Sequence, residues 1–243
     1  MKKVFCVTAF LLVFCSFSLF SEDNLPGFFL SLREAVYEQN LTSREIIPIY
    51  NEAKKQAGLS FRGKDLYLIL SRCEYMMGRA YQYEEQKDKA GSHYDAGIEQ
   101  AQKSLDISPS DAAWQMLAEN ISQNCAVKST AYAIANGLKV QTYSENALKL
   151  NPNNAACQYM VAARWVFAPA PFHNYKRGIQ MMEDIINNNN DGMQKDDRFN
   201  VHSAIGYAYF QQKKYKEAKP WLEKSLDVYP TNKFVRSMLN EVG

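Results

Sequence analysis

The feature that most constrains the fold is a six-residue phrase that occurs three times, at residues 104–109, 147–152 and 225–230. Each copy reads small residue, leucine, charged residue, aliphatic residue, variable residue, proline. Proline cannot continue a helix and disfavours helical angles in the residue before it. Each copy therefore predicts the end of one helix and a turn into the next. The three copies indicate that the chain contains internally repeated helical units. The predicted N-caps of the helices that follow are Asp111, Asn153 or Asn154, and Asn232 or Thr231.

Helical spacing of apolar residues continues through the chain after Pro26, with no sustained two-residue alternation, so we expect an all-α protein. Pro26 opens one predicted helix. Thr42 and Glu45 form a capping-box pattern for a second helix, which Gly58 is expected to stop. The clearest apolar stripe, within residues 64–86, consists of Leu66, Ile69, Leu70, Cys73, Met76, Met77, Ala80 and Tyr81. A further helix is expected at about residues 90–107.

Residues 199–232 carry a pattern of small and large packing positions along two predicted helices. Gly206 and Ala218 would let two helix backbones approach closely, and Tyr209 and Leu222 would fill the space beside them. The other positions of this pattern are Ile205, Tyr215 and Ser225. Together these residues resemble a tetratricopeptide repeat (TPR), a pair of antiparallel helices. The resemblance implies a right-handed superhelical stack of such pairs, an α-solenoid of about ten or eleven helices.

The TPR resemblance is looser over residues 64–186, where prolines at 168–171 interrupt one repeat. Residues 187–191 are expected to form a polar loop. The layout from residue 127 onward is also similar to the TPR domain of regulator-of-microtubule-dynamics proteins and their bacterial relatives. Residues 22–60 show no such resemblance, and whether they form a degenerate repeat is left open.

The N-terminus has the order of a secretory signal: Lys2 and Lys3, then an apolar run at residues 4–20, then polar residues. We expect cleavage after Ser21 and an exported, periplasmic or otherwise extracytoplasmic protein. Lipidation at Cys15, or a retained membrane anchor, is the alternative. The expected division of the chain is a signal peptide at 1–21, N-terminal helices at 22–60, TPR-like repeats at 61–232 and a C-terminal capping helix at 233–243.

Charge and chemistry exclude several classes of function. The chain has 28 lysines and arginines against 26 acidic residues, so removal of the signal lysines leaves a neutral protein without a footprint for nucleic acid. His93, His173 and His202 are not at metal-ligand spacing, and Asp196 and Asp197 fit a solvated helix cap. The three cysteines outside the signal lack CxxC spacing and favour buried thiols over a disulfide. We expect no metal, no cofactor and no enzymatic activity.

Binding is the function that the repeat predicts, because the first helices of stacked pairs line a concave surface. Carried over through the TPR resemblance, the groove positions are Arg72, Tyr75, Arg79, Gln82, Tyr83, Met116, Asn120, Gln123, Tyr159, Asn200, Ser203 and Tyr207. Aromatic residues and arginine favour a protein or peptide partner, so the first hypothesis is an adaptor or scaffold. That several of these tyrosines pack against the next repeat is the competing interpretation.

A second hypothesis is a transporter-associated carrier that encloses a small apolar ligand in a pore. The residues that could line such a space are Trp165, Val166, Phe167 and Phe172. The competing interpretation is that they form the ordinary core of an irregular repeat.

Overall fold

The computed structural model describes residues 25–242, so the predicted signal at residues 1–21 lies outside the described residues. This part of the chain contains eleven α-helices, one short 3-10 helix and no strand, which confirms the all-α prediction. The helices are α1 (Gly27–Glu38), α2 (Ser43–Ser60), α3 (Gly63–Tyr83), α4 (Lys87–Ile107), α5 (Asp111–Val127), α6 (Thr130–Leu150), α7 (Ala155–Phe167), α8 (Tyr175–Asn189), η2 (Asn190–Gly192), α9 (Lys195–Gln211), α10 (Tyr215–Val228) and α11 (Lys233–Val242).

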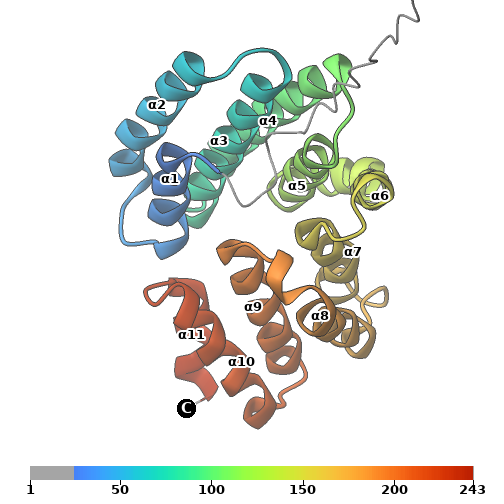
Figure 1. Cartoon of the computed structure of the whole chain (residues 1–243). Helices are drawn as coiled ribbons and strands as arrows, with labels where there is room; N and C mark the ends of the chain where they lie inside the picture. The colour runs from blue at the N-terminus through green and yellow to red at the C-terminus, as the bar shows by residue number, and fades with distance from the viewer. Residues whose placement is uncertain (1–24, 243) are drawn as a thin grey trace, which may run out of the picture.

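The helices pack as consecutive pairs, α1 with α2, α3 with α4, and so on to α9 with α10. The odd-numbered helices also touch one another in order, α1 with α3, α3 with α5, α5 with α7, α7 with α9 and α9 with α11. Figure 1 shows α1, α3, α5, α7 and α9 around the middle of the molecule and their partners outside. This inner layer of first helices is the arrangement that the repeat predicted.

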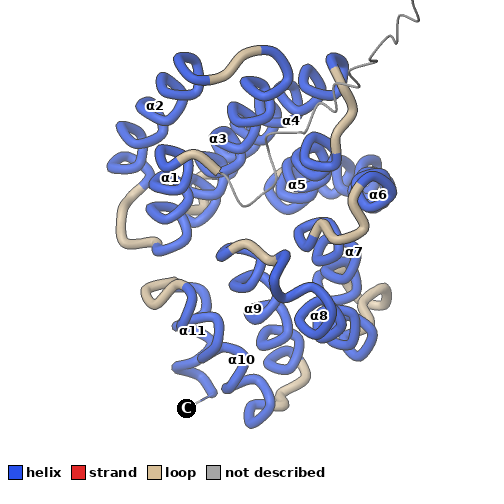
Figure 2. The backbone as a smooth tube through the Cα atoms, viewed as in Figure 1, coloured by secondary structure: helices blue, strands red, loops and turns tan. Residues whose placement is uncertain are grey.

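The stack curves until its last helices meet its first one. In Figure 2 the arc of helices brings α11 beside the end of α1. At this junction Thr231 Oγ1 donates to the carbonyl oxygen of Glu38 at 2.6 Å, and Asn232 Nδ2 donates to the carbonyl oxygen of Tyr37 at 3.0 Å. The C-terminal end of the stack, where a capping helix was expected at residues 233–243, is therefore in contact with α1. The helices form a closed ring.

An aromatic cluster and an ion pair hold the ring closed. The ring of Tyr37 stacks on Tyr229 at 4.9 Å between centroids and meets Phe199 edge-on at 5.6 Å. All three side chains are buried. Beside them Arg33 Nη1 of α1 lies 2.7 Å from Asp196 Oδ1 of α9. We call these contacts, with the two hydrogen bonds above, the ring closure.

The helix ends follow the repeated phrase closely. The three copies end α4 at Ile107, α6 at Leu150 and α10 at Val228, as predicted. The capping box of Thr42 and Glu45 is present at the start of α2. Inside the C-terminal repeat, a Cβ atom on Gly206 would lie 2.7 Å from Leu222 Cδ2, so only glycine allows α9 and α10 to approach this closely.

Two predicted helix signals were wrong. Gly58 does not stop α2, which runs to Ser60 because the Arg62 guanidinium supplies a donor to the Gly58 carbonyl oxygen at 2.6 Å. Asp111 is not the N-cap of α5, since Ser110 Oγ accepts the capping bond from a backbone N–H. The carboxylate of Asp111 instead accepts from Asn151 Nδ2 at 2.9 Å in the next connection.

The polar segment at residues 187–191 was also predicted wrongly as a loop. Helix α8 continues to Asn189, and η2 follows it directly. Asn189 Nδ2 donates to the carbonyl oxygen of Asn153 at 2.7 Å, and this bond fixes the end of α8 against the start of the same repeat. Of the caps expected for the other connections, Asn154 and Asn232 each accept the bond from a backbone N–H.

Candidate binding site on the inner face

One face of α3 gathers aromatic residues around an arginine. Tyr75, Arg79 and Tyr83 stand on successive turns, at the spacing of four that places helical side chains on one face. Arg79 Nη1 donates to Tyr75 Oη at 3.0 Å, and Arg79 Nη2 donates to Tyr83 Oη in a shorter bond. The guanidinium also lies 5.1 Å from the ring centroid of Tyr37, which α1 contributes. Three tyrosines from two helices thus surround one cation.

A fourth tyrosine reaches this cluster from α7. Burial raises the pKa of Tyr159 to about 12, against the opposing effect of the positive charge of Arg79. Burial is also the main cause that raises the pKa values of Tyr37 and Tyr75. These phenols therefore keep their protons at neutral pH. We call Tyr37, Tyr75, Arg79, Tyr83 and Tyr159 the Arg79 cluster.

The Arg79 cluster contains no acidic side chain. Between residues 25 and 242, none of the ion pairs formed within 4.0 Å involves Arg79. Its contacts are the two tyrosine hydroxyl groups and the faces of three tyrosine rings. Arg79, Tyr83 and Tyr159 are each half-buried, so part of the cluster reaches the solvent.

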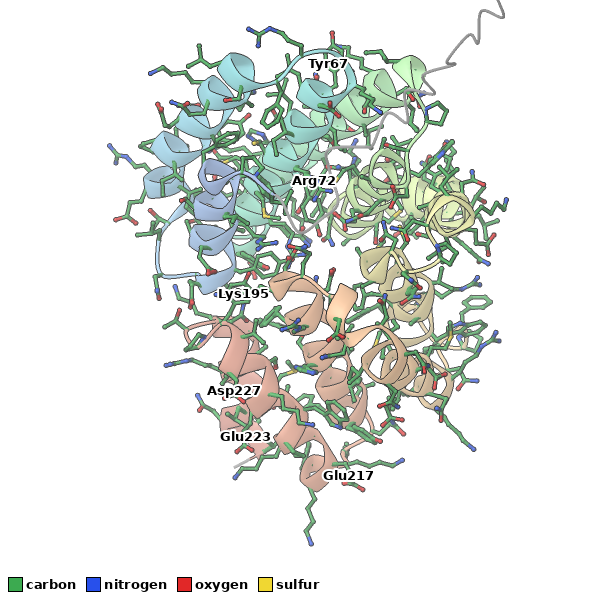
Figure 3. All side chains as sticks on the ribbon, viewed as in Figure 1. Tyr67, Arg72, Lys195, Glu217, Glu223 and Asp227 are labelled. Carbon is green, nitrogen blue, oxygen red and sulfur yellow. The ribbon has the colours of Figure 1, made fainter. Side chains whose placement is uncertain are left out.

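A second polar group lies beside the Arg79 cluster, at the junction of α1, α3, α5 and α9. A cavity of about 20 Å³ there is lined by the buried side chains of Arg33 and Arg72 and by Glu119 and Asp196, among others. That volume holds about one water molecule. Figure 3 labels Arg72 in the upper half of the ring, and Lys195 where α9 approaches α1. Arg33 and Asp196 pair between α1 and α9, Glu119 accepts from Gln115 of its own helix, and the cavity is too small for a ligand.

The structure brings together about half of the predicted groove residues. Tyr75, Arg79, Tyr83 and Tyr159 belong to the Arg79 cluster. Three others border it: Arg72 and Met116 line the small cavity with Tyr75, and Asn200 Nδ2 donates to Tyr37 Oη at 3.3 Å.

The other predicted groove residues do not join this site. Asn120 is fully buried, because it packs against Gly97 of α4, where a Cβ atom would lie 2.2 Å from its Oδ1. Gln82 accepts a short hydrogen bond from Tyr94 of α4. Ser203 donates to a carbonyl oxygen of its own helix at 3.1 Å. The remaining two are Tyr207, which stacks on Phe167, and Gln123, which is partly exposed on α5.

The residues proposed to line an apolar pore lie in different environments. Val166 is buried against Gly178, whereas Phe167 is 49% exposed and Phe172 is 71% exposed. Trp165 lies under the guanidinium of Arg177, 4.0 Å from the ring centroid. These positions favour the core of an irregular repeat, with two aromatic side chains left at the surface.

Sequence reasoning missed Arg33, Tyr37 and the role of Asp196. The first two were missed because residues 22–60 were not aligned with a repeat. One signal was available: Arg33 and Tyr37 are four residues apart, like the pairs on α3, and would share a helix face. Asp196 was predicted to be a solvated cap, but it pairs with Arg33, and its neighbour Asp197 accepts the capping bond from the Gln194 N–H at 3.0 Å.

The histidines and cysteines lie among packed side chains. His93 Nδ1 lies 2.7 Å from Glu74 Oε2, and His173 stacks on Tyr175. Burial lowers the pKa of His202. In the described part of the chain Cys73 and Cys157 are buried and Cys125 is half-buried, and no group of three metal-ligating side chains gathers. No helix between residues 25 and 242 has the length and apolar character of a membrane span.

Comparison with known proteins gives two family matches. The model described as regulator of microtubule dynamics protein 1-3 matches residues 33–184, more than half of the chain, from α1 to α8. The tetratricopeptide repeat model matches residues 199–232, which confirms the TPR resemblance over the same range. A comparison with curated proteins finds no match. Among solved structures, YrrB, described as a TPR protein with an unusual peptide-binding site, is 12% identical, with 89% of this chain and 98% of that chain covered and a TM-score of 0.37.

Proposed function

The chain belongs to the regulator of microtubule dynamics protein 1-3 family, and we propose that it is a non-enzymatic scaffold that holds a segment of a partner protein. It is a TPR-type helical protein, and such repeats present extended concave surfaces to proteins and peptides. The observation that carries the proposal is the Arg79 cluster, because it turns aromatic side chains and an arginine toward the inside of the ring. Tyrosine and arginine are the residues that protein interfaces concentrate at their centres.

The proposal includes a place of action outside the cytoplasm. Its support is the order of residues 1–23: two lysines, an apolar run and a short polar end. We therefore take only the helical scaffold from the family and propose no microtubule role. N-terminal sequencing of the protein isolated from its own cells tests this part. A mature chain that begins at residue 22 supports export, and an intact Met1 on a cytoplasmic protein refutes it.

Site-specific crosslinking tests the scaffold itself. A photoreactive phenylalanine analogue in place of Tyr159 would lie on the inner face, and the same analogue in place of Leu138 would lie on the outside of α6, where Leu138 is 75% exposed. We expect a discrete protein adduct from position 159 and none from position 138. Adducts at position 138 alone, or no adduct from either position in the protein's own extract, would refute an inner binding face.

A further inference from the structure

We propose that the Arg79 cluster binds a single carboxylate group, carried by an acidic side chain or the C-terminus of a peptide. The identity of the ligand as part of a protein rests on the proposed function. The carboxylate site itself rests on the hydrogen-bond donors and charges of the cluster.

The hydrogen-bonding groups that remain unused in the Arg79 cluster are donors. Tyr75 Oη and Tyr83 Oη both accept from Arg79, so each phenolic proton is free to donate to a third group. No hydrogen bond within residues 25–242 uses either proton, and none uses the hydroxyl group of Tyr159. A guanidinium also carries more N–H donors than the two that these bonds use. An oxyanion is the ligand that such a set of donors accepts.

The charges around Arg79 also favour an anionic ligand. A cation taken out of water is costly unless an anion pairs with it. The nearby acidic residues are already engaged: Asp196 pairs with Arg33, Asp197 caps α9, and Glu119 accepts from Gln115 Nε2 at 3.0 Å. An acid from another molecule would supply the missing partner.

The Arg79 cluster fits a ligand with one negative charge better than a ligand with two. Arg79 is one cation among neutral phenols, and the negative charges of Glu119 and Asp197 are close enough to raise the pKa of Tyr159. A doubly charged phosphate would meet this repulsion with a single cation in reach. A carboxylate matches the planar fork of the guanidinium and leaves its second oxygen for the tyrosine hydroxyl groups.

Nuclear magnetic resonance titration of the full chain tests the site with two small probes. N-acetylglutamate amide carries the carboxylate, and N-acetylglutamine amide is its neutral isostere. The signal is the side-chain Nε–Hε resonance of Arg79, assigned by its loss in Arg79→Lys. We expect the glutamate probe to shift this resonance and to bind about tenfold more tightly than the glutamine probe. Equal binding of the two probes, or no shift at millimolar concentrations, would overturn the proposal.

Two variants and a third probe complete the test. Tyr83→Phe removes one phenolic proton and keeps the ring, so it should weaken the glutamate probe by about threefold or more while the protein stays folded. Arg44→Gln removes an exposed arginine of α2 and should leave binding unchanged. Inorganic phosphate should bind more weakly than the glutamate probe. Tighter binding of phosphate, or no effect of Tyr83→Phe, contradicts a carboxylate site.

The outcome for this site is separable from the outcome for the scaffold. A protein adduct at position 159 that survives Arg79→Gln keeps the scaffold and overturns the carboxylate site. Binding of the glutamate probe at Arg79 without any protein adduct keeps the carboxylate site and overturns the scaffold.

Discussion

The ring closure depends most on Tyr37, and its removal should open the ring. Tyr37 has 0% of its side chain exposed and lies between Tyr229 at 4.9 Å and Phe199 at 5.6 Å. Tyr37 belongs to α1, whereas Phe199 belongs to α9 and Tyr229 directly follows α10. Tyr37→Ala therefore removes the largest apolar contact between the two ends of the stack.

The expected cost can be worked from these contacts. Truncation of a buried aromatic residue to alanine costs about 3–5 kcal/mol. The polar contacts that remain include hydrogen bonds from Thr231, from Asn232 and from the Lys233 N–H to Gln39 Oε1, and the ion pairs of Arg33 with Asp196 and of Lys195 with Glu34, each of which contributes about 1 kcal/mol. The loss is thus comparable in size to these polar contacts taken together. We expect the variant to populate an open arc with its helices still folded.

Small-angle scattering and hydrogen exchange measure this opening. Tyr37→Ala should raise the radius of gyration and speed exchange of the amides of α1 and α11. Met182→Ala is the matched control, because Met182 is fully buried in the separate core around α7, α8 and α9 and its truncation also costs about 2–5 kcal/mol. The reasoning fails if Tyr37→Ala leaves scattering unchanged, or if Met182→Ala expands the protein equally.

Two further predictions concern helix packing and pH. Gly97→Ala should destabilise the fold by about 1–3 kcal/mol, because the new Cβ atom meets the buried Asn120. Gly137→Ala lies on an open helix face and should stabilise the fold by about 0.5–1 kcal/mol; chemical denaturation of both variants measures the difference. Burial raises the pKa of Glu74, but hydrogen bonds from His93, Lys54 and a tyrosine outweigh it, so the pKa lies below its usual value of 4.5. The stability due to the carboxylate is therefore present above that value and is lost as the pH falls through the lowered pKa. Glu74→Gln should cost about 3–5 kcal/mol at pH 6 and less at pH 3, and an equal cost at both values would contradict this account.

Local features of the fold could be predicted because they depend on neighbouring residues. The phrase ending at Pro109, Pro152 or Pro230 stops a helix wherever the chain goes next, and the Thr42 capping box needs only three following residues. Gly206 was identified from its spacing to the large residue that it accommodates. Such signals give the helices, their pairs and the inner layer.

The ring closure could not be predicted because it joins residues about 160–195 positions apart. No sequence signal near Tyr37 predicts that the Tyr229 ring lies 4.9 Å from the Tyr37 ring. The burial of Asn120 has a related cause, since this residue of α5 faces Gly97 of the neighbouring helix α4.

The closure and the candidate site share a residue, and this makes them thermodynamically dependent. Tyr37 packs on Tyr229 in the closure and also lies 5.1 Å from the Arg79 guanidinium. An open arc would leave Tyr37 next to Arg79, because α1 packs on α3, but it would remove the Tyr229 and Phe199 rings that hold the Tyr37 ring in place. A carboxylate bound to Arg79 should therefore prefer the closed ring, and by linkage it must then stabilise the closure by the same factor. Tyr37→Ala should accordingly weaken the glutamate probe as well as expand the protein, whereas Met182→Ala should do neither.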